Sequence, residues 1–111
     1  NMDGTAIMQG LATMFIASTA GIDLSIIEYI QIVMLAMVAS IGTAAVPSAG
    51  TITLALILST LGLPLDAIGL ILAVDRILDM IRTSVNVCGD AAVACIVANS
   101  EKLIDRSIFN K

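Results

Sequence analysis

Long apolar stretches separated by short polar breaks predict an all-α membrane protein. The first stretch covers residues 4–20 and is about 17 residues long, which is near the minimum for a helix that spans a bilayer. A break at residues 21–23 ends it. Ser25 and Glu28 then have the spacing of a capping box, in which each side chain satisfies a backbone N–H at a helix start. A second helix is therefore expected from residue 25 onward, toward Val46.

The break at residues 46–50 decides the predicted topology. Pro47 and Gly50 disfavour a continued regular helix. The next apolar segment, residues 51–62, is only about 12 residues or roughly 18 Å long, against a hydrocarbon core of about 30 Å. Because this segment is too short to cross alone, the pattern favours a re-entrant hairpin over residues 25–62. Irregular backbone at membrane depth is tolerated only where protein or an aqueous cavity surrounds it, so the tip is expected to line a site. A spanning helix kinked at Pro47 is the alternative.

The last apolar segment predicts one long spanning helix over residues 66–98, followed by a charged tail at residues 99–111. Three of the five cations lie in that tail, namely Lys102, Arg106 and Lys111. The connection at residues 23–28 and the turn at residues 64–66 contain no cation. By the positive-inside rule, the C-terminus is expected in the cytoplasm.

Composition supports a membrane location and excludes several functions. Of the 111 residues, 59 % are hydrophobic and 13 % are charged, whereas a soluble domain has about a quarter of its residues charged. The mean hydropathy is +1.05. A net charge of −4 argues against nucleic acid. With no histidine and no close cysteine pair, the chain has almost no ligands for a transition metal, and Cys88 and Cys95 are interpreted as packed thiols.

Polar residues form one stripe along the last predicted helix. At about 100° per residue, most of them fall within a narrow face, whereas Arg76 lies near its edge and is interpreted as structural. The stripe carries three carboxylates against one Arg, so it must admit cations or keep some carboxylates protonated. Its oxygen-rich groups suit a hard cation such as sodium. The stripe consists of Asp75, Asp79, Arg82, Thr83, Asn86 and Asp90.

Three motifs, in order, resemble the C-terminal part of the dicarboxylate/amino acid:cation symporter family, the glutamate and aspartate transporters. They are Asn1-Met2-Asp3-Gly4-Thr5; Ser40-Ile41-Gly42-Thr43-Ala44 followed by Val46-Pro47-x-Ala49-Gly50; and Asp75-x-x-x-Asp79-x-x-Arg82-Thr83-x-x-Asn86-x-x-Gly89-Asp90. The resemblance covers residues 1–101. It implies that residues 1–20 are the second half of a broken seventh membrane helix, residues 25–62 the second hairpin and residues 66–98 the eighth membrane helix of a transport domain. The chain, which opens at Asn1 without a starting Met, would then be a fragment.

The resemblance also implies roles for individual residues, with sodium as a coupling ion and no further cofactor. One sodium site would use Asn1, Asn86 and Asp90, and a deeper one Asp3 with Asn1. A third site would use the carbonyls of Ser40, Ile41 and Thr43 with the Met2 sulfur nearby. An acidic amino acid would lie between Thr5, the tip and the last helix, with Asp79 on its amino group, Arg82 on its side-chain carboxylate, Thr83 and Asn86 adding hydrogen bonds, and Asp75 steadying Arg82. The tip residues are Val46, Pro47, Ser48, Ala49 and Gly50, where Ser48 replaces the more common Gly.

The expected function is sodium-coupled symport of aspartate or glutamate, with the tip as a gate. The expected partners are the bilayer and the remaining N-terminal helices, and the resemblance implies a homotrimer. A proton-coupled or C4-dicarboxylate carrier is the nearest alternative, and a non-transporting truncated membrane fragment is another. An intramembrane aspartyl protease is disfavoured, because Val87 replaces the first Gly of the G-x-G-D motif and a catalytic dyad needs carboxylates on separate helices.

Overall fold

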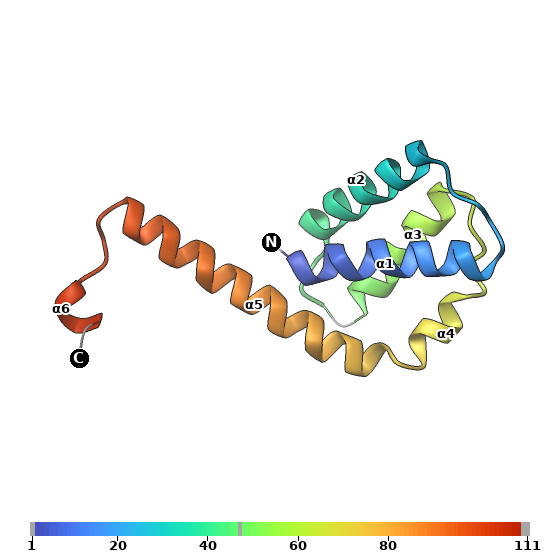
Figure 1. The fold of residues 1–111 in the computed structure, drawn as a ribbon. Coiled ribbons are helices and arrows are strands. Elements are labelled where there is room, and N and C mark those ends of the chain that lie inside the picture. Colours follow the sequence, from blue (N-terminus) through green and yellow to red (C-terminus); the bar gives the residue numbers. More distant parts are fainter. Residues whose placement is uncertain (1, 47, 110–111) are drawn as a thin grey trace.

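The computed structural model describes residues 2–46 and 48–109, and in these ranges every regular element is a helix. The helices are α1 (Asp3–Thr19), α2 (Ile26–Gly42), α3 (Ala49–Thr60), α4 (Ile68–Leu72), α5 (Asp75–Ser100) and α6 (Arg106–Phe109). Helices α1 to α4 lie together, whereas the C-terminal half of α5 extends away from them (Figure 1). The all-helical prediction is confirmed for the described part of the chain.

The start of α2 follows directly from its sequence. The Ser25 hydroxyl accepts a hydrogen bond from the Glu28 backbone N–H at 3.4 Å, and the Ser25 N–H donates to the Glu28 carboxylate at 2.6 Å. Both halves of the predicted capping box are therefore present.

Helices α1 and α3 end in the same way, each at a glycine. Gly21 and Gly62 both have a φ of +69°, which a residue without a Cβ adopts at little cost. The following residues close each helix through bonds to carbonyls five positions back, from Ile22 N to Ala17 O at 3.0 Å and from Leu63 N to Leu58 O at 2.9 Å. These two ends turn the chain back on itself after α1 and after α3.

The break between α2 and α3, at residues 43–48, overlaps the predicted break at residues 46–50 but begins three residues earlier. Helix α2 ends at Gly42, and Thr43 is extended with φ −72° and ψ 124°. Helix α3 begins at Ala49, two residues before the expected position, after Ser48 in the left-handed region at φ +64°. Helices α2 and α3 contact each other, and both contact α1.

The core lies between α1, α3 and α4. Its buried apolar residues are Ala12, Ile16 and Ala17 from α1, Leu54 and Leu58 from α3, and Leu63 and Ile71. The same face of α1 also buries Thr5, Gln9 and Thr13. The buried face of α1 therefore changes from apolar to polar toward the N-terminus of α3.

The expected continuous helix over residues 66–98 is wrong at its start. The chain forms the short helix α4, turns at Ala73 and Val74, and begins α5 at Asp75. Bonds to carbonyls three residues back, from Leu70 N to Ala67 O at 3.2 Å and from Val74 N to Ile71 O at 3.1 Å, make this turn tight. No Gly or Pro marks it, and its consequence is that Asp75 lies in the first turn of α5, where exposed N–H groups favour a carboxylate.

Helix α5 is long and apolar enough to cross a bilayer, and it is the one helix of the described residues that meets this test. Beyond it, Asp105 accepts hydrogen bonds from the Ser107 backbone N–H at 2.9 Å and from the Ser107 hydroxyl at 2.6 Å. These bonds, chiefly the one from the hydroxyl, hold the pKa of the exposed Asp105 carboxyl below its usual value.

Candidate substrate and cation site

Helices α1 and α5 cross at close range because both have glycine at the contact. A Cβ built on Gly4 would lie 2.8 Å from the Arg82 carbonyl oxygen, and one on Gly89 would lie 2.8 Å from an Asp3 carboxylate oxygen. Neither position has room for a larger residue without movement of a neighbour. The crossing brings the first predicted motif against the third.

Asn86 joins the two helices at this crossing. Its side-chain oxygen accepts a hydrogen bond from the Gly4 backbone N–H at 2.8 Å, and its amide nitrogen donates to the Thr5 hydroxyl at 3.2 Å. The Asn86 oxygen keeps a second lone pair for another donor or a cation. Asn86 thus stabilises the site as well as lining it.

Arg82 is the buried residue of α5, with 7 % of its side chain exposed. Its Nη2 lies 2.5 Å from an Asp79 carboxylate oxygen and 3.7 Å from an Asp75 oxygen. The family resemblance implied the contact with Asp75. Asp79 keeps 51 % of its side chain exposed, whereas Asp75 keeps 16 %. Asp79 can therefore turn toward another cationic group, and Asp75 is the more fixed partner.

The first turn of α3 packs on the Arg82 guanidinium. A Cβ added to Gly50 would lie 3.1 Å from Nη1 of Arg82 and 3.3 Å from its guanidinium carbon. That nitrogen is buried and has no hydrogen-bond partner among the described residues. It therefore keeps donors that a planar carboxylate could accept.

A polar cavity of about 680 Å³ lies between the α2–α3 connection and α5. Its charged lining consists of Asp75, Asp79 and Asp90 against Arg76 and Arg82. With a guanidinium and a half-exposed carboxylate in one space, the cavity suits a small molecule that carries both an anionic and a cationic group. The predicted site residues that line it are Met2, Thr5, Thr43, Val46, Ser48, Ala49, Gly50, Asp75, Asp79, Arg82, Thr83, Asn86 and Asp90.

Other predicted residues lie elsewhere. The Asp3 carboxylate packs on Gly89. The Ser40 hydroxyl is bonded to the Met37 carbonyl at 2.8 Å, and Ile41 is 72 % exposed, although the cation role predicted for both residues concerned their carbonyls. Asn1 and Pro47 lie outside the described residues.

The sequence interpretation missed two polar residues near this cavity. Arg76 lines the cavity, so its position at the edge of the stripe does not remove it from the site. Gln9 is fully buried on α1 and contacts α3. An amide within an apolar helix was a visible signal, but its partner on another helix was not.

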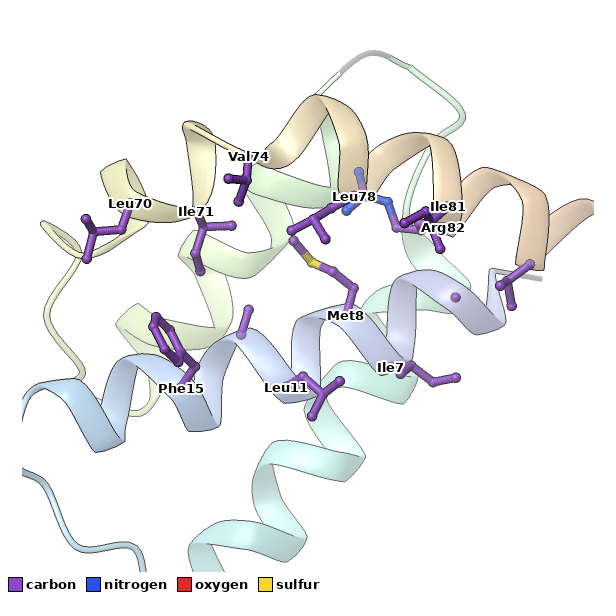
Figure 2. Close-up of a pocket in the computed structure, with 13 residues that line it drawn as sticks. Ile7, Met8, Leu11, Phe15, Leu70, Ile71, Val74, Leu78, Ile81 and Arg82 are labelled. Atoms are coloured by element: carbon purple, nitrogen blue, oxygen red, sulfur yellow. The ribbon is translucent and has the colours of Figure 1, made fainter.

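A second cavity, of about 540 Å³, lies on the other side of Arg82 and is almost wholly apolar. Figure 2 shows Met8, Leu11 and Phe15 of α1 facing Ile71, Val74 and Leu78, with Met8 pointing toward Leu78 and Arg82. Arg82 lines both cavities. Arg82 therefore has apolar side chains on one side and the carboxylates of the polar cavity on the other.

No three Asp, Glu, Cys or His side chains of the described residues gather as they would around one metal ion. Two of the three cation sites expected from the resemblance use one carboxylate with amide oxygens, and the third uses backbone carbonyl oxygens near the Met2 sulfur. Such ligands suit alkali cations and not transition metals.

Comparisons with known proteins identify the family of this chain. The family model of the sodium:dicarboxylate symporter family matches residues 1–100, so the chain belongs to that family. Similar proteins include an excitatory amino acid transporter of Onchocerca volvulus and excitatory amino acid transporter 3 of Mus musculus, both 49 % identical over 92 % of this chain. Excitatory amino acid transporter 2 of Mus musculus is 47 % identical over the same share.

The chain spans about a fifth of the length of these relatives, namely 21 %, 20 % and 18 %. All three are named as transporters, which agrees with the expectation that the chain is not part of an enzyme.

Proposed function

We propose that the protein containing this chain carries out sodium-coupled symport of acidic amino acids, and that this chain supplies much of the substrate and cation site. The observation that carries the proposal is the buried Arg82, which lies between two carboxylates and the first turn of α3 and faces a polar cavity. Similarity to excitatory amino acid transporters supports the same class of substrate.

In this proposal Arg82 binds the side-chain carboxylate of the substrate. Its Nη1, which has no hydrogen-bond partner among the described residues, provides donors in the planar arrangement that matches a carboxylate. Asp79, half exposed beside it, exchanges Arg82 for the substrate ammonium group, while Asp75 continues to hold the guanidinium. Thr83, Asn86 and Thr5 line the same cavity and offer neutral hydrogen bonds.

Sodium compensates the acidic excess of the cavity. Three carboxylates against two arginines leave a charge of −1, and an acidic amino acid adds a further −1 on binding. Asp90 with Asn86 and Asn1 would hold one ion, Asp3 and Asn1 a second, and the carbonyls of Ser40, Ile41 and Thr43 near Met2 a third. Coupling then follows because neither the anion nor the cations are stable in the site alone.

The α2–α3 connection, with its tip at residues 46–50, would act as the gate of a re-entrant hairpin. Thr43, Val46 and Ser48 line the cavity, so movement of this connection opens or closes it. In the proposed membrane topology, α1 is half of a broken helix, α5 spans the bilayer and the C-terminus is cytoplasmic. The complete protein would be a trimer assembled through helices outside this chain.

Substitution of Arg82 tests the proposal. In the full-length protein, Arg82→Cys should abolish aspartate and glutamate binding, because a buried carboxylate left unpaired costs several kcal/mol. Serine and cysteine could still bind through Asp79 and the tip. Calorimetry with aspartate and serine would measure this. Aspartate affinity retained within about tenfold, or about 1.4 kcal/mol, would assign Arg82 a purely structural role.

Calorimetry with succinate distinguishes the proposed function from the dicarboxylate alternative, which the family name includes. A C4-dicarboxylate lacks an ammonium group, so it has no use for the exposed Asp79 carboxylate. If succinate binds and aspartate does not, the substrate class proposed here is wrong.

A further inference from the structure

Gln9 is a buried amide on α1 that reaches across to α3. Its side chain is fully buried, and its Nε2 donates to the Thr53 hydroxyl and to the Gly50 carbonyl oxygen, the latter at 3.5 Å. Its Oε1 is buried with no partner among the described residues. Burial of an amide with an unsatisfied oxygen costs free energy. An apolar side chain would pack in the core without this cost.

Both Gln9 partners belong to the start of α3. The Thr53 hydroxyl also bonds to the Ala49 and Gly50 carbonyls at 3.0 and 3.1 Å, so this turn is held together from within. Gly50 is the residue that packs on the Arg82 guanidinium. A contact path therefore runs from Gln9 through Gly50 to Arg82.

We propose that Gln9 is a positioning residue that holds the first turn of α3 against Arg82 and thereby sets how long substrate stays bound. The inference rests on the proposed function and deepens it. Gln9 does not line the substrate cavity, so it acts through Gly50 and Arg82 and not on the substrate itself. Helix α3 contacts α1 along its apolar face as well, and Gln9 adds the polar connection nearest the tip.

Gln9→Met separates this role from a role in folding. Methionine has a similar length and fills similar space, while it removes both the donor and the buried acceptor without a partner. Thr53 and Gly50 keep their bond to each other, so the substitution creates no new unsatisfied group. The melting temperature of the full-length protein should therefore stay the same or rise.

Substrate dissociation should change instead. In the full-length protein in nanodiscs, Gln9→Met should weaken aspartate affinity about tenfold, almost entirely through faster dissociation. Thr53→Val should act in the same direction. The double variant should bind aspartate no more weakly than the weaker-binding single variant, because both substitutions remove the same contact between Gln9 and Thr53.

Thr13→Val is the matched control. Thr13 lies one turn further along α1, is equally buried, and donates its hydroxyl to the Gln9 backbone carbonyl at 2.7 Å. Because this bond stays within α1, the control should leave aspartate dissociation within about twofold of the original.

Amide hydrogen exchange tests the role of Gln9 without substrate. Gln9→Met should speed amide exchange at residues 51–53 without a general increase over α1 and α3. Unchanged exchange there, unchanged aspartate dissociation, or an equal effect of Thr13→Val would each overturn the positioning role. If the unsubstituted protein binds no aspartate, the proposed function fails, and the exchange experiment still decides the role of Gln9.

Discussion

Single residues in this site have two roles, because the groups that face the cavity also hold the helices together. Asn86 bonds to Gly4 and Thr5 while it lines the cavity. Arg82 contacts two carboxylates and the backbone of α3. A substitution in the site is therefore informative only when its effect on binding is compared with its effect on stability.

Asp90 is the residue whose charge should determine sodium affinity. It lines the cavity one helical turn from Asn86, and no ion pair to it is present among the described residues. Asp90→Asn should raise the sodium concentration for half-maximal aspartate binding at least about tenfold, because a carboxylate binds a hard cation far better than an amide does. Aspartate affinity at saturating sodium should change less.

Asp66→Asn provides the control for Asp90, since Asp66 is exposed and lies in the loop before α4, outside the cavity. The sodium concentration for half-maximal aspartate binding should rise for Asp90→Asn and stay near the unsubstituted value for Asp66→Asn. An unchanged half-maximal sodium concentration for Asp90→Asn would remove Asp90 from the cation site.

Ser48 holds a left-handed backbone conformation at the start of α3. A φ of +64° costs a residue with a Cβ about 1–2 kcal/mol, and a β-branched residue more. Ser48→Gly should keep aspartate affinity within about threefold, whereas Ser48→Val should weaken it about tenfold, since valine disfavours the conformation that starts α3. Ser59→Val, on an exposed helical position of the same helix, should have little effect. Equal affinities for the glycine and valine variants would show that this conformation does not matter for binding.

At the scale of elements, the sequence predicted what local chemistry determines. The Ser25–Glu28 pair marked the start of α2, and Pro47 with Gly50 marked the break before α3. The turn at Ala73 and Val74 was missed, because no Gly or Pro marks it and apolar residues continue through it. The helical spacing of the stripe correctly placed Arg82 near Asp75 and Asp79, but the contact between Gln9 and α3 depends on packing between helices.

The crossing of α1 and α5 depends on Gly4. Gly4→Ala places a Cβ 2.8 Å from the Arg82 backbone oxygen, which cannot move without α5. We expect a loss of about 1–3 kcal/mol in unfolding free energy, together with weaker substrate binding. Gly10→Ala on the same helix has nothing within 4 Å of its new Cβ, and it should stabilise by about 0.5–1 kcal/mol through helix propensity. Denaturant unfolding of the two variants measures the difference. Equal unfolding free energies of the two variants would show that the contact between Gly4 and α5 can accommodate a Cβ.

At the scale of the whole molecule, the described chain is extended and its apolar surface is largely uncovered. Its radius of gyration is 17.2 Å, against about 13 Å for a compact domain of this length. Arg82 is the one buried residue in the 26 residues of α5. Ile30, Val33 and Met37 on α2 are among many exposed large apolar side chains. Apolar surfaces of this kind suit contact with lipid or with further protein.

This incomplete cover leads to a prediction for the 111-residue chain by itself. Reconstituted alone in liposomes, it should not accumulate aspartate under a sodium gradient, whereas the full-length protein should. The chain spans about a fifth of its relatives, and its cavity holds three carboxylates and two arginines in a segment proposed to lie within the bilayer. Each such charge costs about 2.5–3.5 kcal/mol there unless protein or water surrounds it. In the proposed function, helices outside this chain complete the site, so the chain alone should lack part of it. Co-reconstitution with the remaining segments, expressed separately, should restore some uptake. Robust sodium-driven uptake by the chain alone would show that the substrate and ion pathway needs no other part of the transporter.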